Sequence, residues 1–131
     1  MAFEFYQDDI NTSPQLTYVK ATEDEAYTPG ELLKIGSAGT ATKASGTDAP
    51  QYVCHQINGK AAEGDLLQVV RIQKNHKYKT TLAAAGTALV VGQKVTIHTD
   101  GAQATATTTG GVLEIVEMMG TTVGSEIIVR M

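Results

Sequence analysis

The chain has 131 residues, a formal net charge of −4 and one cysteine. This length predicts a single domain with a core of modest size. Aliphatic side chains must supply most of that core, because the chain has no Trp and only two Phe. Lysine and arginine form no cluster, which argues against a nucleic-acid partner held through its phosphates. A single cysteine excludes an internal disulfide and suits a reducing compartment.

The beginning of the chain does not have the pattern of a secretory leader. Glu4, Asp8 and Asp9 stand where a leader would have basic residues and then an apolar stretch. No apolar run approaches the roughly 20 residues that a membrane-spanning helix needs. We therefore expect synthesis in the cytoplasm and no membrane partner.

Residues 1–14, MAFEFYQDDINTSP, contain both Phe residues of the chain. Phe3 and Phe5 alternate with Glu4, which is typical of a short strand. Two interpretations stay open: an extended N-terminal arm that docks onto another subunit, or an ordinary first strand that packs on its own sheet. We favour the arm, because two large apolar residues are unusual in a terminus that merely frays. Residues 15–131 then form a single β domain.

A glycine precedes each of four short apolar runs, at Gly30, Gly64, Gly92 and Gly124. Glycine adopts positive φ without a Cβ clash and turns the chain into the strand that follows. Four such turns predict an all-β fold, a small barrel or sandwich of hairpins with at most one short helix.

Two stretches of the chain are related, and we interpret them as two hairpin units over residues 27–56 and 89–120. Each begins with an apolar run, continues through a segment rich in Gly, Ala, Ser and Thr, and closes with a second apolar run. The alternation of Ala and Thr at 104–108 predicts a narrow hairpin in the second unit, and by analogy the first unit is a hairpin with a long tip.

The remaining elements follow from local patterns. Asn58-Gly59 is the strongest hairpin-turn signal in the chain. NHKY at 75–78 is predicted to be a polar turn or loop, and 79–89 is the one plausible short helix, with Gly86 as its stop. Further strands are expected at 16–21, 65–73, 95–98, 104–108, 112–118 and 126–130.

Residues that carry chemistry form no convincing constellation in the sequence. Cys54-His55 suggests a nucleophile and a base, but neighbouring strand residues point to opposite faces, so the thiol and imidazole should not meet. His55, His76 and His98 lack the spacing of zinc ligands. We find no phosphate-binding loop and no nucleophile elbow. The sequence predicts no catalytic residue, no cofactor and no metal, and we expect a protein that is not an enzyme.

Residues 29–56, PGELLKIGSAGTATKASGTDAPQYVCHQ, resemble the core of the lambda-type head decoration (capsid cement) proteins of tailed phages. Members of that family share a Pro before an apolar strand, a small-residue hairpin, a Gly-Thr-Asp-Ala type of turn and a second apolar strand. The best local match is 46–49, GTDA, ahead of 52–54, YVC. The second half of the chain is similar to the Gly/Thr/Ala-rich hairpins of small phage capsid proteins, although the unit at 89–120 departs from the compact family member.

The resemblance implies a β-tulip-like cement protein on the outer capsid surface of the virion. Such a protein binds the major capsid protein, often as a homotrimer, with its N-terminal arm reaching across the shell. The expected capsid-binding residues are Phe3, Phe5, Tyr6 and Ile10. Two alternatives remain: another virion structural protein, such as a head fibre base or tail component, and a small-ligand-binding β-barrel or enzyme.

Overall fold

The computed structural model describes residues 2–8, 16–55 and 58–131. Within these ranges the chain forms strands and no helix, so the all-β prediction is confirmed. The strands are β1 (Glu4–Asp8), β2 (Leu16–Lys20), β3 (Ala26–Tyr27), β4 (Leu32–Ile35), β5 (Ala41–Lys43), β6 (Tyr52–Cys54), β7 (Asn58–Lys60), β8 (Leu66–Arg71), β9 (His76–Thr81), β10 (Lys94–Val95), β11 (Leu113–Met118) and β12 (Glu126–Arg130).

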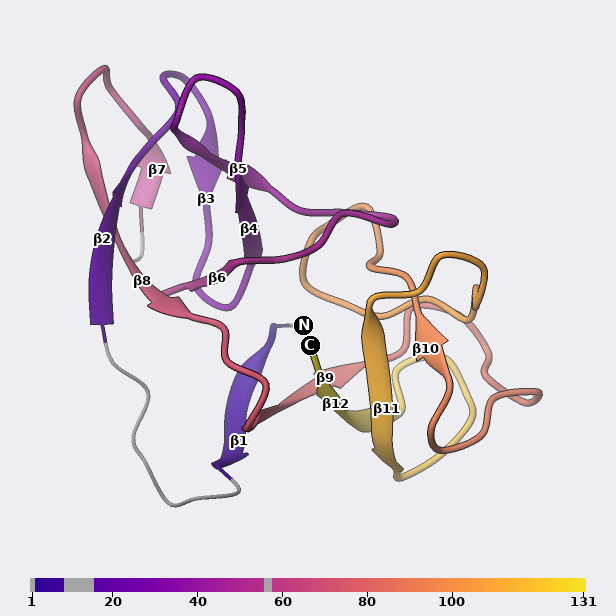
Figure 1. Ribbon diagram of the computed structural model, residues 1–131. Coiled ribbons are helices and arrows are strands. Elements are labelled where there is room, and N and C mark those ends of the chain that lie inside the picture. Colours follow the sequence, from indigo (N-terminus) through magenta and orange to yellow (C-terminus); the bar gives the residue numbers. More distant parts are fainter. Residues whose placement is uncertain (1, 9–15, 56–57) are drawn as a thin grey trace.

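The strands form two five-stranded antiparallel sheets and one two-stranded ribbon (Figure 1). Sheet A has the order β1-β9-β12-β11-β10, and sheet B has the order β2-β8-β6-β4-β5. The ribbon pairs β3 with β7. Neither sheet closes into a barrel, so the architecture is an open sandwich.

A row of apolar side chains crosses sheet B from its β2 edge towards the interior. The register aligns Leu16 with Val70, Val70 with Val53, and Val53 with Leu32. Residues directly opposite one another in a sheet share a face. Along this row burial rises from the exposed Leu16 to the fully buried Leu32. Sheet A therefore covers the β4 end of this face and leaves the β2 end open.

Sheet A has a matching row. Its register aligns Phe5 with Tyr78, Tyr78 with Val129, and Val129 with Ile115. Phe5, on the edge strand β1, is exposed, while the other three are buried in the core between the sheets. Both sheets thus bury their central apolar side chains together and expose the apolar side chains of β1 and β2.

The opposite face of sheet B has its own core beneath the β3–β7 ribbon. Leu33, Cys54, Leu67 and Val69 pack there against Tyr27 of β3. The Tyr27 hydroxyl donates to the Ala41 carbonyl at 2.6 Å and accepts from the Thr22 N–H at 2.8 Å. The ribbon is therefore anchored to sheet B by burial and by a satisfied hydroxyl.

Small residues join the two sheets at the edge away from β1 and β2. Gly46, which follows β5, exchanges two backbone hydrogen bonds of 2.8 and 3.0 Å with Ile97, which follows β10. A Cβ on Gly110 would lie 2.7 Å from the Thr47 methyl group, and one on Gly111 would overlap the Lys94 backbone. The Gly-rich segments of the two predicted units therefore pack against each other, an arrangement that the sequence pattern did not reveal.

The turns predicted at the four glycines that precede strands are confirmed. Gly30, Gly64, Gly92 and Gly124 have φ values of 81°, 84°, 96° and 87°. Each lies in a turn, and β4, β8, β10 and β12 follow directly. The predicted strand at 65–73 is β8, and those at 112–118 and 126–130 are β11 and β12.

The short helix expected at 79–89 and the polar loop expected at 75–78 are both wrong. Strand β9 begins at His76, and His76, Tyr78 and Thr80 are buried in strict alternation with partly buried neighbours. Pairing with β1 on one side and β12 on the other places β9 inside sheet A. This tertiary pairing outweighs the modest helix propensity of the Ala-rich segment that follows.

The hairpin turn expected at Asn58-Gly59 is also wrong. Both residues belong to β7, in which Asn58 pairs with Tyr27 of β3, and Gly59 does not have a positive φ. The predicted strands at 95–98 and 104–108 face each other as an irregular hairpin with a single bridge between Ile97 and Ala104. Further hydrogen bonds link Thr96 to Thr105 and Thr107, which supports the predicted pairing without regular strands.

The close approach at Gly111 gives a stability prediction. Gly111→Ala places a methyl group against the Lys94 backbone, which cannot move without disturbing β10, so we expect a loss of about 3 kcal/mol in the free energy of unfolding. Gly39→Ala is the matched control, because Gly39 has a positive φ but open space around its Cβ position. It should cost about 1 kcal/mol, from backbone strain alone. Urea unfolding followed by circular dichroism measures both, and equal losses would contradict the packing role of Gly111.

Candidate functional site

The described part of the expected N-terminal arm is a strand of the chain's own sheet. Residues 4–8 pair with β9, and the Phe3 N–H donates to the Gly30 carbonyl at 2.9 Å. Phe3 is 3% exposed and belongs to the core between the sheets. In this chain Phe3 is therefore covered by its own core, and the segment that follows is a first strand of the chain's own sheet. The capsid-binding role expected of Phe3 stays a prediction. Ile10 lies outside the described residues.

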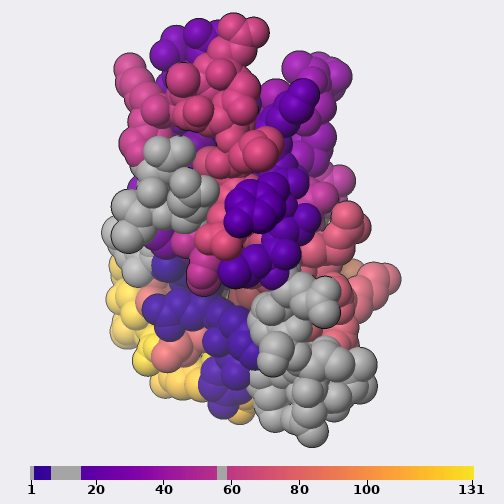
Figure 2. All heavy atoms as spheres, turned by 90° about the vertical axis from the view of Figure 1, so that its left-hand side faces the viewer, coloured from indigo at the N-terminus to yellow at the C-terminus, as the bar shows by residue number. Residues whose placement is uncertain are grey.

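Phe5 and Tyr6 remain at the surface, and they belong to a larger apolar area. We call this area the β1–β2 face and define it by the exposed side chains of Phe5, Tyr6, Leu16, Tyr18 and Leu66. Tyr18 of β2 is the most exposed of them at 62%. Figure 2 shows the atoms of β1, β2 and β8 together on one side of the molecule. Phe5 and Tyr6 of β1 were predicted from the sequence as contact residues. Leu16, Tyr18 and Leu66 of β2 and β8 were not.

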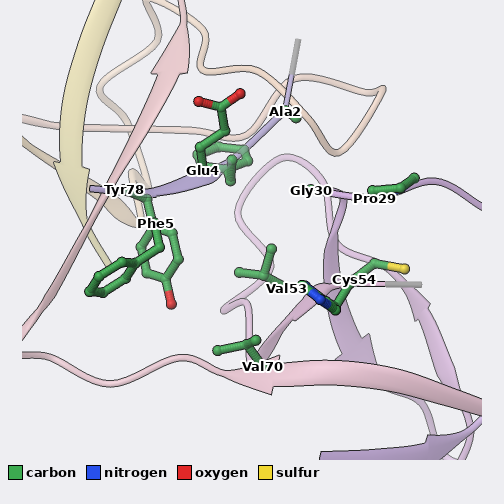
Figure 3. Close-up of a pocket in the computed structure, with 11 residues that line it drawn as sticks. Ala2, Glu4, Phe5, Pro29, Gly30, Val53, Cys54, Val70 and Tyr78 are labelled. Atoms are coloured by element: carbon green, nitrogen blue, oxygen red, sulfur yellow. The ribbon is translucent and has the colours of Figure 1, made fainter. Parts of the chain in front are cut away.

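A cavity of about 380 Å³ opens between the sheets beside this face (Figure 3). On the sheet A side, the lining residues are Phe3, Glu4, Phe5 and Tyr78. On the sheet B side, they are Val53, Cys54 and Val70. Ala2, the Pro29-Gly30 turn and His55 complete the lining. The cavity thus forms where the two apolar rows diverge towards their edge strands.

The hydroxyl of Tyr78 is the notable polar group of this cavity. Tyr78 is 2% exposed, and its hydroxyl has no hydrogen-bond partner among the described residues. Burial raises the pKa of Tyr78 to about 12, so the hydroxyl is neutral across the physiological range. A buried hydroxyl without a partner costs about 1–3 kcal/mol relative to a satisfied one. The alternation of His76, Tyr78 and Thr80 is the sequence signal that could have identified this residue as inward-facing.

Aromatic contacts hold Phe5 at the mouth of the cavity. Its ring lies edge-on to His76, with ring centroids 5.2 Å apart, and edge-on to Tyr78 at 6.0 Å. Such edge-to-face pairs contribute about 0.5–1.5 kcal/mol beyond the area they bury. Phe5 is nevertheless 41% exposed, so one side of its ring meets solvent.

Cys54 and His55 do not form a nucleophile–base pair. Cys54 is buried in the core beneath the β3–β7 ribbon, and His55 is exposed. This agrees with the expectation that the two side chains point to opposite faces. Among the residues that the structure describes, no three His, Cys, Asp or Glu side chains gather into a possible metal site. Over the same residues no helix is long and apolar enough to cross a membrane.

Glu31 is a second buried polar group that sequence analysis missed. It precedes β4 and is almost fully buried, and it accepts a hydrogen bond from the Thr28 hydroxyl at 3.0 Å. Burial raises the pKa of its carboxyl group, while the Thr28 hydrogen bond and the charge of Lys43 oppose that shift. One carboxyl oxygen of Glu31 has no partner within the described chain. Glu31 does not line the cavity, so we assign it no part in the site.

The turn that carries the family resemblance is organised by Asp48. Its carboxylate accepts hydrogen bonds from the Lys34 ammonium group at 2.8 Å and from the Ser45 N–H at 3.1 Å. The Lys34 hydrogen bond, followed by that of Ser45, lowers the pKa of Asp48 below its ordinary value. Asp48 therefore closes the turn and ties it to β4.

Comparison with known proteins identified no relative: no protein-family model and no curated protein matches this chain.

The lowered pKa of Asp48 gives a prediction about pH. Because its folded-state pKa lies below the unfolded value, its contribution to stability is present above about pH 4 and is lost as the pH falls through the folded-state pKa. D48N should lower the free energy of unfolding by about 1 kcal/mol or less at pH 7, since the pair with Lys34 is partly exposed. The deficit should shrink below about pH 4.

Urea unfolding at pH 7 and pH 3 tests this. The control is E63Q, which removes a charge at an exposed turn position. A D48N deficit that stays constant down to pH 3 would contradict the assigned role of the carboxylate.

Proposed function

We propose that this chain is a phage capsid decoration protein, which binds the outer surface of the shell formed by the major capsid protein and stabilises the head. The observation that carries the proposal is the β1–β2 face. It is an apolar area made by the edge strands of both sheets, and Tyr18 and Tyr6 stand out from it. Several exposed apolar side chains on one side of a small protein are typical of a surface that binds another protein.

The family resemblance supports the same function. Residues 29–56 supply β4, β5 and β6, which are three of the five strands of sheet B, and the GTDA turn at 46–49 begins where the two sheets are joined. The resemblance therefore falls on structural segments, while the β1–β2 face lies at the opposite edge of both sheets. A decoration protein needs both: a stiff β framework and an exposed adhesive surface.

The free energy available from burying the β1–β2 face suits a protein that links neighbouring subunits of the shell. Burying one large apolar side chain contributes about 1.5–3 kcal/mol, and the β1–β2 face offers several that are already about half exposed. Edge strands β1 and β2 also present backbone groups to which an extended partner segment can add as a further strand. A homotrimer would bind through three such surfaces at once, and the linkage would increase the avidity.

The contact surface in this proposal differs from an arm of residues 1–14. Phe3 is left out because it is buried, and Phe5 and Tyr6 act from within a strand of the sandwich. Leu16, Tyr18 and Leu66 are added because they extend the same face across β2 and β8. The virion, on its outer capsid surface, is the expected location.

The double variant Y6S/Y18S tests the contact surface. Both side chains are exposed, so the fold should be kept, while affinity for the shell should fall at least about tenfold because aromatic side chains dominate protein interfaces. The control is V90S/V123S, which removes exposed apolar side chains from turns beyond the β1–β2 face. Binding is measured by co-sedimentation with expanded heads of the major capsid protein encoded in the same genome.

Retained binding of Y6S/Y18S, or an equal loss in both double variants, would show that this face is not the contact surface. Failure of the unmodified protein to sediment with expanded heads would contradict the proposed function itself. Light scattering after size exclusion tests the trimer separately. The expected mass is three times the 13.8 kDa of one chain, and a monomer mass at all concentrations would contradict the trimer in solution.

A further inference from the structure

The cavity at the open end of the sandwich has the features of a binding site that a purely adhesive protein does not require. We propose that it binds a small neutral aromatic molecule carrying one hydrogen-bonding group, which pairs with the hydroxyl of Tyr78. The inference rests on the cavity and is independent of the proposed capsid role.

The walls of the cavity determine the size and the apolar character of the ligand. Side chains of Phe3, Phe5, Val53 and Val70 line it, and among the residues that the structure describes no Lys or Arg does. Its volume of about 380 Å³ lies at the lower end of the roughly 300–1,000 Å³ range of small-molecule sites. Aromatic rings on the sheet A side favour an aromatic guest through edge-to-face contacts. A molecule of two fused rings suits this space.

The Tyr78 hydroxyl determines the polar group of the ligand. It is buried, it belongs to a residue that lines the cavity, and it has no partner in the described chain. Figure 3 shows the ring of Tyr78 extending from β9 so that its hydroxyl points towards the Val70 side. A ligand hydroxyl or carbonyl placed there would satisfy a group that the protein itself leaves unsatisfied. This makes the site selective among molecules of the same shape.

The charges around the cavity exclude an anionic ligand. Glu4 is the acidic side chain in the lining, and its carboxylate lies 3.9 Å from the Lys79 ammonium group, which does not itself line the cavity. A carboxylate or phosphate ligand would enter an apolar site beside Glu4 without a lining lysine or arginine to compensate it. The favoured ligand is therefore neutral.

Phe5 controls access to the hydroxyl. The Tyr78 oxygen is closed off from solvent, so a ligand reaches it only when a neighbouring side chain moves aside. Phe5 lies edge-on to Tyr78 at 6.0 Å and is the partly exposed aromatic residue of the lining. We assign Phe5 the role of a cover over the Tyr78 hydroxyl.

The test uses three probes of one shape: 2-naphthol, naphthalene and 2-naphthoate. They are titrated into ¹⁵N-labelled protein, and amide shifts report both affinity and location. We expect 2-naphthol to shift the amides of Gly30, Cys54 and Tyr78 and to bind about tenfold more tightly than naphthalene, which is the effect of one hydrogen bond to a buried group. 2-Naphthoate should not bind at the cavity.

Tyr78→Phe separates binding from structure. It should reduce 2-naphthol affinity to that of naphthalene, about tenfold, and leave naphthalene unchanged. The urea midpoint of the free variant should equal or exceed that of the unmodified protein, because the lost hydroxyl had no partner. Tyr52→Phe is the matched control, since its hydroxyl lies 3.4 Å from an Arg71 nitrogen and outside the cavity lining, and it should leave affinity for both probes unchanged.

Three results would overturn the proposal: shifts confined to the β1–β2 face, equal 2-naphthol affinity in Tyr78→Phe and the unmodified protein, or a lower urea midpoint in Tyr78→Phe. Val70→Phe provides a second variant with Tyr78 intact. Val70 is only partly buried, and the larger ring narrows the cavity from the sheet B side. It should reduce 2-naphthol affinity at least about tenfold by filling the space, and unchanged affinity would also overturn the proposal.

Discussion

The structure depends on a junction between the two sheets at the edge formed by β5 and β10. Gly46 and Ile97 exchange two backbone hydrogen bonds there, and Gly110 lies against Thr47 with no room for a side chain of its own. Backbone contacts of this kind fix the separation of the sheets where they occur. The sheets can then share a continuous core near the junction, and they diverge with distance from it.

The exposed apolar surface and the cavity are both consequences of this divergence. In each sheet one apolar row runs from a fully buried residue, Leu32 or Ile115, to an exposed one on an edge strand, Leu16 or Phe5. Near the junction the facing rows touch, and at the far edge they do not. The cavity lies between the region where the two rows touch and the edge where they are apart. The β1–β2 face lies at that edge, on the side of the cavity away from the junction. One geometric constraint therefore accounts for the core, the cavity and the exposed apolar edge.

Structural features that depend only on neighbouring residues in the sequence were predicted correctly. The positive φ of Gly30 and its three counterparts follows from the turn each must make, whatever lies nearby. Prediction from the sequence failed where distant partners decide the outcome. Asn58-Gly59 is a strong turn signal, yet pairing with β3 draws it into a strand. The polar residues of β9 gave no strand signal, because His76, Tyr78 and Thr80 become buried only when β9 takes its place between β1 and β12 in sheet A.

The same distinction explains what could be predicted of the candidate site. Phe3 and Phe5 have the same local pattern, and only the hydrogen bond from Phe3 to Gly30 shows which of them enters the core. Tyr18 and Leu66 join one surface because β2 and β8 are neighbours, which no pattern within either segment reveals.

An edge strand with exposed apolar side chains normally promotes aggregation, and proteins commonly protect such edges with charge. Here Lys20 is the charged residue of β2, at the end of the strand, while Leu16 and Tyr18 occupy the exposed positions before it. Charge therefore protects one end of this strand and leaves the apolar positions before it uncovered. The β2 edge thus departs from the usual protection of an edge strand at the positions of Leu16 and Tyr18.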